Sequence, residues 1–348
     1  MPRKPTALAR QAREGIITLV SSLASDEALP TLRELGATFD LHPSTMFRML
    51  RDLAAEGILW QHPGGRFFSA ATRRQNLKGA PLCFIGREMW QWSRLYQEIL
   101  EGVSEVCSAN GSPLVTLSAP SLVRQSDPTH PPQFSTPRIQ QKEMAALLTA
   151  VPRGCAGLVL DHLWKQSALA LPGFPGGERI QLLHGTNQHA RVISPDYRAG
   201  AVLVHRHILT QGFTEAVLVT PFEGDPAVQA ALEELRKTLT GLTQREIPFR
   251  AAGQEIQTMR KAGRNNKSCL ICPEDNIALA LFGLCQTQRY DSSRSLIATQ
   301  GTGVIHAPIT RLRYDYHGIG RSAAAGILHG SSLPPLRPCL IPSPSCQR

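Results

Sequence analysis

Hydrophobic and polar positions follow two different patterns along the chain, and the first pattern belongs to its N-terminal part. Thr31 and Glu34 have the spacing of a capping box, which predicts that a helix starts at Thr31. A tight turn is expected at Asp40 and Leu41, and Pro43 then suits the first position of a second helix. The pattern therefore predicts two short helices joined by a turn.

The second of these helices is predicted to have one apolar and one polar face. Its apolar side chains recur at helical spacing: Met46, Leu50 and Leu53. The opposite face carries polar, aromatic and basic side chains: Ser44, Phe47, Arg48 and Arg51. A helix that follows a short helix and a turn, and that exposes arginines, has the form that enters the DNA major groove.

A β-hairpin is predicted after the second helix. Gly57 ends the helix, the apolar segments 58–60 and 66–68 are typical of strands, and a Pro-Gly-Gly turn joins them. Arg66 would then lie at the tip of this two-stranded wing, and a helix at 9–23 would complete the core. A helical hairpin and a β-hairpin used only for packing would show the same pattern, so the pattern alone leaves that alternative open.

From residue 81 the pattern changes to short apolar segments that alternate with amphipathic ones. Strands are predicted at 82–85, 114–117, 157–161, 180–183, 191–194, 216–219, 269–272 and 296–298. Helices are predicted at 95–109, 140–151, 196–210, 225–239, 277–286 and 316–328. Such alternation is typical of an α/β domain whose parallel sheets are covered by helices on both faces. The Pro-, Ser- and Thr-rich segment 118–138 is predicted to be a long surface loop.

This change of pattern divides the chain into a DNA-binding domain at 1–72, a linker at 73–80 and an α/β domain at 81–348. Parallel sheets of this type bind ligands beyond the carboxyl ends of their strands. The candidate loops follow Ile85, Asp161 and Thr220, and include 273–275 and 299–300. No phosphate-binding Gly-Lys-Ser/Thr loop and no G-x-S-x-G motif is present, so neither an enzyme nor a cofactor is expected.

Composition adds a preference for a polyanionic partner. The net charge is +10 with a pI near 9.5, and residues 1–78 hold eleven Lys and Arg against seven Asp and Glu, a balance of +4. No apolar run is long enough for a membrane span, and the N-terminus lacks the apolar core of a signal peptide, so a cytoplasmic protein is expected. Cys269 and Cys272 form a C-x-x-C inside a predicted strand, without a second pair, so no metal site is expected.

The segment 29–68, LPTLRELG…STMFRMLRDLAAEG…GGRFF, resembles the winged helix-turn-helix of GntR-type bacterial repressors. The resemblance implies that double-stranded DNA is the partner. The residues expected near DNA are Arg33, Ser44, Thr45, Phe47, Arg48, Arg51 and Arg66. Pro43 and Phe47 stand where that family usually has arginines. Neither can form the bidentate contact to guanine, so the operator sequence does not carry over.

Residues 81 to about 342 resemble the effector-binding domain of LacI-type repressors, a pair of α/β subdomains like those of periplasmic binding proteins. The segments that carry this resemblance are 83–86, 95–115, 190–219, 270–284 and 309–328. The order of the two resemblances matches hybrid regulators that place a GntR-type reader before a LacI-type sensor. The resemblance implies a homodimer that binds a small-molecule effector, a sugar among the candidates.

Carrying pocket positions over from that family gives the candidate effector-binding residues Arg87, Trp90, Trp92, Asp161, Asp275, Gln300 and Tyr314. Ordinary packing is the alternative for each tryptophan, and a helix N-cap is the alternative for Asp275. Sugar-binding members usually have an arginine early in the helix after the 216–219 strand, and none lies between Gly224 and Arg236. The expected ligand is therefore a different one, or the pocket has degenerated.

Together these features predict a ligand-responsive, DNA-binding transcription regulator, most simply a repressor that reads a two-fold symmetric operator. Two other classes remain open. A solute-binding protein would share the fold of 81–342 but would not need the N-terminal winged helix. An α/β enzyme with a nucleic-acid-binding appendage would need a catalytic group of His, Asp or Glu at the strand ends.

Overall fold

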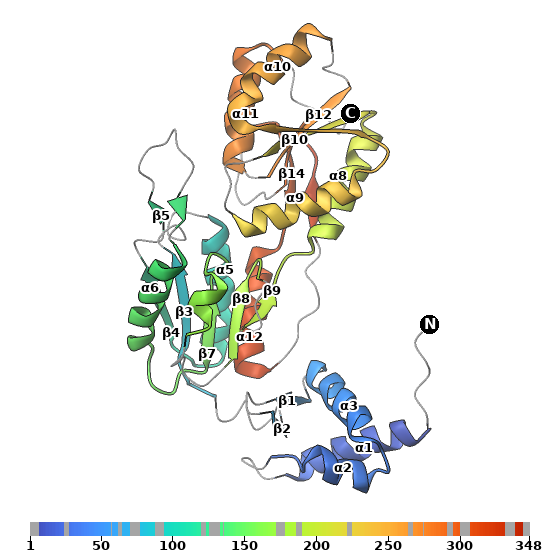
Figure 1. Ribbon diagram of the computed structural model, residues 1–348, viewed down its shortest axis with the longest axis vertical. Helices are drawn as coiled ribbons and strands as arrows, with labels where there is room; N and C mark the ends of the chain where they lie inside the picture. Colours follow the sequence, from blue (N-terminus) through green and yellow to red (C-terminus); the bar gives the residue numbers. More distant parts are fainter. Residues whose placement is uncertain are drawn as a thin grey trace.

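The structure is a computed structural model of the chain (Figure 1). The residues that it describes are 7–23, 28–56, 58–61, 65–69, 77–87, 94–119, 123–124, 133–134, 136–171, 178–185, 190–220, 225–263, 267–273, 275–290, 295–299, 307–330 and 338–343.

Among the described residues, the N-terminal part contains three helices and an antiparallel hairpin, at the lower end of the molecule in Figure 1. Their bounds are α1 (Ala7–Ser22), α2 (Leu32–Thr38), α3 (Pro43–Ala55), β1 (Leu59–Gln61) and β2 (Phe67–Ser69). In the hairpin Leu59 pairs with Ser69, and Gln61 pairs with Phe67. These are the helices and the hairpin that the sequence predicts, and together they form a winged helix-turn-helix.

Local hydrogen bonds explain where α2 begins and ends. The Glu34 amide donates to the Thr31 hydroxyl at 3.3 Å, and the Thr31 amide donates to the Glu34 carboxylate at 2.7 Å, as in the predicted capping box. In the turn, Asp40 has a φ of 51°, and the Leu41 amide donates to the Gly36 carbonyl at 2.9 Å. A Cβ on Gly36 would lie 2.7 Å from the Leu41 carbonyl oxygen, so this turn requires glycine.

One apolar cluster joins the three helices to the hairpin. Its buried members are Ile16, Val20, Leu29, Leu35, Met46, Leu50, Leu53, Leu59 and Phe67. The predicted apolar face of α3 therefore lies wholly in this core. A fully buried side chain of this size contributes about 1.5–3 kcal/mol, which holds α3 in one orientation and leaves its other face exposed.

The first α/β subdomain has a five-stranded parallel sheet in the order β4-β3-β7-β8-β9. Its strands are β3 (Leu82–Arg87), β4 (Leu114–Ala119), β7 (Gly157–Leu160), β8 (Glu178–Leu182) and β9 (Arg191–Ile193). Its helices are α5 (Arg94–Ala109), α6 (Pro137–Thr149), α7 (Gln166–Leu169) and α12 (Tyr316–His329). Alternate β3 residues face different layers, because Phe84 packs in a cluster with α5 and α12, and Ile85 in one with α6 and α7.

The second subdomain has a six-stranded sheet in the order β11-β10-β12-β13-β14-β15, parallel except for the last strand. Its strands are β10 (Glu215–Thr220), β11 (Thr243–Pro248), β12 (Ser268–Cys272), β13 (Leu296–Ala298), β14 (Thr310–Arg313) and β15 (Cys339–Ile341). Its helices are α8 (Tyr197–Thr210), α9 (Pro226–Thr238), α10 (Ala252–Lys261) and α11 (Asp275–Thr287), with a short 3₁₀ turn at Phe249–Ala251. Leu218 packs in the cluster with α8 and α9, and Val219 in the cluster with α10 and α11.

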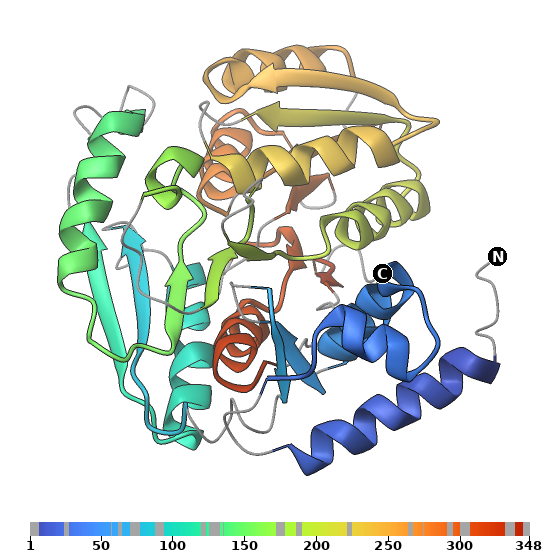
Figure 2. The same cartoon turned by 60° about the horizontal axis from the view of Figure 1, so that its bottom comes forward.

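The chain passes between the subdomains three times, after β9, after β14 and before β15. Figures 1 and 2 show α12 (red) in the first subdomain, although it directly follows β14 of the second. It packs closely on α5 because two glycines let the backbones touch. A Cβ on Gly102 would lie 2.0 Å from the His317 carbonyl oxygen, and one on Gly320 would lie 2.0 Å from the Ile99 carbonyl oxygen.

Several elements differ from the sequence-based expectation. The segment 118–138 is not one long loop, because it contains an antiparallel ribbon of β5 (Val123–Arg124) and β6 (Gln133–Phe134), and α6 begins at Pro137. The sequence also did not predict β11, α10, β14 or β15. The segments of β11 (TQREIP) and β14 (TRLR) are charged, and only tertiary pairing makes them strands.

Candidate functional site

The exposed face of α3 carries the predicted polar and basic side chains. Ser44, Phe47, Arg48 and Arg51 are exposed, and Thr45 is half-buried. The Phe47 ring remains 36% exposed and meets the buried Phe67 ring of the wing edge-on, with 6.2 Å between the centroids. The Arg51 guanidinium lies 6.0 Å from the Phe47 centroid, within the range of a cation–π contact. Phe47 thus connects the basic face of α3 to the wing.

The first turn of α3 is arranged in a way that suits an anion. His42 caps the helix, because its Nδ1 accepts the Ser44 amide at 3.3 Å and lies 2.8 Å from the Ser44 hydroxyl. The first turn contains no acidic side chain. The partial positive charge of a helix N-terminus favours a phosphate at such a position.

Arg33 on α2 and Arg66 beside the wing are both exposed. Thr31 hydrogen bonds lower the pKa of Glu34, and the charge of Arg66 lowers it further, so Arg66 lies near the start of α2. The structure therefore brings the seven predicted DNA-binding residues onto α2, α3 and the wing of one small domain.

The predicted effector-binding residues fall into two groups. Trp90, Trp92 and Gln300 lie outside the described residues, as does the side chain of Arg87, whose backbone ends β3. The remaining three are described, and all are buried: Asp161, Asp275 and Tyr314.

Asp161 follows β7 and shapes the loop that comes after it. Its carboxylate accepts the Leu163 amide at 2.5 Å, and its own amide donates to the Ile85 carbonyl. Within the same loop the Trp164 indole N–H donates to the Ile85 carbonyl at 3.2 Å. These bonds tie the 161–165 loop to the carboxyl end of β3.

Two buried glutamines fix the same loop from other elements. The Gln181 amide group on β8 donates to the Trp164 carbonyl at 3.0 Å and also reaches the Asp161 and His162 carbonyls. Gln140 on α6 donates to the Leu163 carbonyl at 3.4 Å and accepts the Lys165 amide at 2.8 Å. Such dense bonding holds the backbone of the loop in one conformation and aims the side chain of His162.

His162 connects the two subdomains. Its Nδ1 lies 2.5 Å from the Tyr96 hydroxyl of α5, and its Nε2 lies 3.1 and 3.2 Å from the two carboxylate oxygens of Asp225. Asp225 caps α9, and its Oδ1 accepts the Ala227 amide at 2.8 Å. Because these contacts join the loop after β7 to the loop after β10, the carboxyl ends of the two sheets face each other here.

His184 lies in the same region, after β8. Burial lowers the pKa of His184, and the nearby His162 lowers it further, whereas Asp225 acts to raise it. Leu183 precedes it with a φ of 62°, a conformation that costs a non-glycine residue about 1 kcal/mol or more. We call Tyr96, His162, His184 and Asp225 the subdomain junction.

The charge on Asp225 is stabilised inside this junction. Burial acts to raise the pKa of its carboxyl, but the His162 ring and the N–H groups at the start of α9 outweigh burial and lower the pKa overall. Asp225 is therefore an anion at neutral pH, positioned against an imidazole.

Tyr314 and Asp275 belong to other elements than the residues of the junction. Tyr314 lies between β14 and α12, where its ring meets Tyr197 edge-on at 5.6 Å and Tyr316 at 6.2 Å. Burial raises its pKa. Gly200 packs against it so closely that a Cβ there would lie 2.3 Å from the Tyr314 hydroxyl. Asp275 occupies the first turn of α11.

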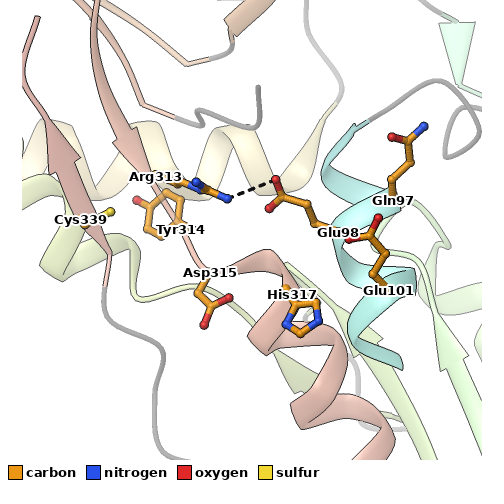
Figure 3. A pocket seen from close by; sticks show the side chains of 8 residues that line it. All are labelled: Gln97, Glu98, Glu101, Arg313, Tyr314, Asp315, His317 and Cys339. Carbon is orange, nitrogen blue, oxygen red and sulfur yellow. Dashed lines mark hydrogen bonds and ion pairs between the residues drawn. The ribbon is translucent and has the colours of Figure 1, made fainter. Parts of the chain in front are cut away.

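Tyr314 also lines a separate pocket of about 540 Å³ where the two subdomains connect (Figure 3). The other lining residues are Gln97, Glu98, Glu101, Arg313, Asp315, His317 and Cys339. The Arg313 guanidinium lies 3.4 Å from the Glu98 carboxylate, across the pocket. Of the predicted effector-binding residues whose side chains the structure describes, Tyr314 lines this pocket and Asp161 and Asp275 do not.

Sequence reasoning named the loops after β7 and β10 but not the residues of the junction. His162 directly follows the predicted Asp161, and Asp225 was expected only as the start of a helix. A histidine next to a polar strand end, and an Asp-Pro pair at the start of a helix, were the available signals. Among the described residues there is no group of three or more His, Cys, Asp or Glu side chains that could hold a metal ion.

Comparison with known proteins identifies the fold of the α/β part. No protein-family model matches the chain, and no curated protein matches it either. Solved structures do match it. The probable maltose operon transcriptional repressor from Staphylococcus aureus is 15% identical with a TM-score of 0.59, over 78% of this chain and 99% of that chain.

Two further solved structures match the same fold. A PurR-family transcriptional regulator from Vibrio parahaemolyticus is 16% identical with a TM-score of 0.57, over 76% of this chain and 98% of that one. The lac repressor dimer bound to operator and an anti-inducer is 15% identical with a TM-score of 0.57, over 77% of this chain and 95% of that one. The α/β part of the chain has the fold of the effector domain of LacI-type transcription regulators. Within the described residues, no helix is both long and apolar enough to cross a membrane.

Proposed function

We propose that this protein is a ligand-responsive transcription regulator that binds double-stranded operator DNA through a winged helix of the GntR type. The observation that supports the proposal best is the combination of two parts in one chain. A helix with an apolar face in its own core exposes Arg48 and Arg51, and it precedes a domain with the fold of LacI-type regulators. The chain divides at 73–80 between these parts.

In this proposal Arg48 and Arg51 face the major groove, together with Ser44 and Thr45. Arg33 lies nearby, and Arg66 contacts a phosphate or the minor groove. Phe47 supplies an apolar edge that suits a thymine methyl group. The protein works in the cytoplasm as a homodimer, since a two-fold protein reads two half-sites and gains specificity from both.

The small-molecule site of this regulator lies between the two subdomains, beyond the facing carboxyl ends of the sheets. Loops from both subdomains meet there, so a molecule bound between them contacts both. It changes DNA binding only if it prefers one arrangement of the subdomains over another. A sugar is one candidate, and no catalytic step is part of the proposal.

The first test is selection of genomic DNA fragments by the purified protein at about physiological salt. An enriched, two-fold symmetric site is expected. Uniform enrichment that disappears as salt rises would refute sequence-specific binding and would leave the α/β part as the functional unit.

The second test uses single arginine variants on the selected site. Arg48→Ala should weaken binding to this site by about 1–3 kcal/mol and binding to random DNA much less. Arg66→Ala should weaken both equally and lower the slope of log K against log salt by about one. Arg206→Ala removes an exposed charge from α8 and serves as the control. Equal losses on both DNAs for Arg48→Ala would exclude α3 as the recognition helix.

A further inference from the structure

The contact between His162 and Asp225 joins side chains of two different subdomains. His162 belongs to the loop after β7, and Asp225 caps the helix that follows β10. The His162 side chain is only 5% exposed, and its Nε2 lies 3.1 Å from the nearer carboxylate oxygen. If the two sheets moved apart at their carboxyl ends, this contact would break, because it spans the space between them.

Both partners are held in place before they meet. His162 stacks on Tyr96, with ring centroids 6.1 Å apart and an angle of 11° between the planes, and it also contacts the tyrosine hydroxyl. On the other side the Asp225 carboxylate accepts the amides of Ala227 at 2.8 Å and Val228 at 3.2 Å. Side chains fixed in this way lose little conformational entropy when they pair. More of their interaction energy therefore stabilises the arrangement in which the two subdomains are in contact.

Other titratable groups lie near the pair. Asp225 acts to raise the pKa values of His184 and Tyr197, and Glu233 acts to raise that of His184. Neither His184 nor Tyr197 brings a second anion next to Asp225. The Asp225 side chain is 31% exposed, so a carboxylate that lost the His162 imidazole would be partly desolvated and without a charge partner that lowers its pKa, which is unfavourable.

We propose that Tyr96, His162 and Asp225 form a latch that holds the two subdomains closed when no small molecule is bound. As a regulatory device, the latch rests on the proposed function. The closed arrangement is then the resting state of the regulator, and an effector acts on a protein whose subdomains are already in contact. Ligand-induced closure would instead require an open resting state.

The experiment compares full-length variants without any added ligand. Asp225→Ser keeps a residue that caps α9 but is too short to reach His162. Tyr96→Phe keeps the ring that stacks on His162 and removes only the hydroxyl. Asp196→Ser makes the same change at the N-cap of α8, where Asp196 accepts the Ala199 amide at 2.8 Å, and serves as the matched control.

The two readouts are amide hydrogen exchange of the 161–165 and 183–185 segments and the radius of gyration from small-angle X-ray scattering. Asp225→Ser should speed exchange of both segments about tenfold and enlarge the radius of gyration, since a tenfold change corresponds to loss of one well-formed interaction. Tyr96→Phe should change the exchange rate and the radius of gyration in the same direction, but by less than Asp225→Ser. Asp196→Ser should match the wild type.

The latch is refuted if the wild type already exchanges these segments as fast as Asp225→Ser, or if Asp196→Ser accelerates exchange equally. These readouts do not involve DNA. If the protein selects no operator but Asp225→Ser exchanges faster than Asp196→Ser, the latch is supported and the proposed function is refuted. If it selects an operator but the two variants exchange equally, the latch is refuted and the proposed function is supported.

Discussion

The exposed face of α3 and the subdomain junction are built in opposite ways. The face of α3 comes from one helix, so its residues lie within a few positions of each other in the sequence, and a local apolar core fixes their direction. The junction takes Tyr96, His162 and Asp225 from three elements that are more than sixty residues apart in sequence.

This difference shows which kind of site a sequence reveals. A helical face follows from spacing alone, since every third or fourth residue points the same way. A junction between two sheets depends on strand order and on where the chain crosses between subdomains. Three predictions test whether the two regions are also energetically separate, from the largest expected effect to the smallest.

The largest effect is expected from Met46→Ala in the winged-helix core. Met46 is fully buried, so the substitution should destabilise that domain by about 2–5 kcal/mol and abolish DNA binding. Urea unfolding followed by circular dichroism should show an early transition for the winged helix and an unchanged one for the α/β part. Met49→Ala, at a half-buried position of the same helix, should cost less. A matching shift of both transitions would mean that the two parts unfold together.

A smaller effect, confined to the α/β part, is expected from Gly320→Ala. The added methyl would lie 2.0 Å from the Ile99 carbonyl oxygen, so α12 must move away from α5 at a cost of about 1–3 kcal/mol. Gly283→Ala is the control, because nothing lies within 4 Å of its Cβ position, and it should stabilise α11 by about 0.5–1 kcal/mol. Equal urea midpoints for the two variants would contradict the close packing of α12 on α5.

The smallest effect is a dependence of the stability of the α/β part on pH. Burial lowers the pKa values of His184 and His207 below the ordinary 6.5. Just below pH 6.5 the unfolded chain therefore binds more protons than the folded chain. The free energy of unfolding has its full value above pH 6.5 and decreases as the pH falls from 6.5 through the lowered pKa values of the folded state. The urea midpoint of the α/β transition should decrease as the pH is lowered from 7.5 to 5.5. His207→Gln should reduce that fall, and an unchanged fall in both His207→Gln and His184→Gln would rule these residues out as its source.

The sequence by itself determined the elements whose causes are local. Thr31 and Glu34 start α2 through reciprocal hydrogen bonds, and Asp196 and Asp225 cap the helices that they precede, as the helix boundaries predicted from the sequence imply. Alternation of apolar segments also predicted the α/β class and the loops at the carboxyl ends of the strands. The helix starts depend on partners that lie within a few residues. The choice between strand and helix depends on the apolar pattern of a whole segment.

Tertiary structure alone decided the rest. The rings of Tyr197 and Tyr316 pack against Tyr314 where the chain crosses between subdomains, and His162 meets a carboxylate sixty-three positions away. The charged segments of β11 and β14 become strands only because neighbouring strands offer them hydrogen bonds. Contacts of this kind depend on the register of two sheets and on close backbone approaches such as that at Gly320, and no local pattern of residues encodes them.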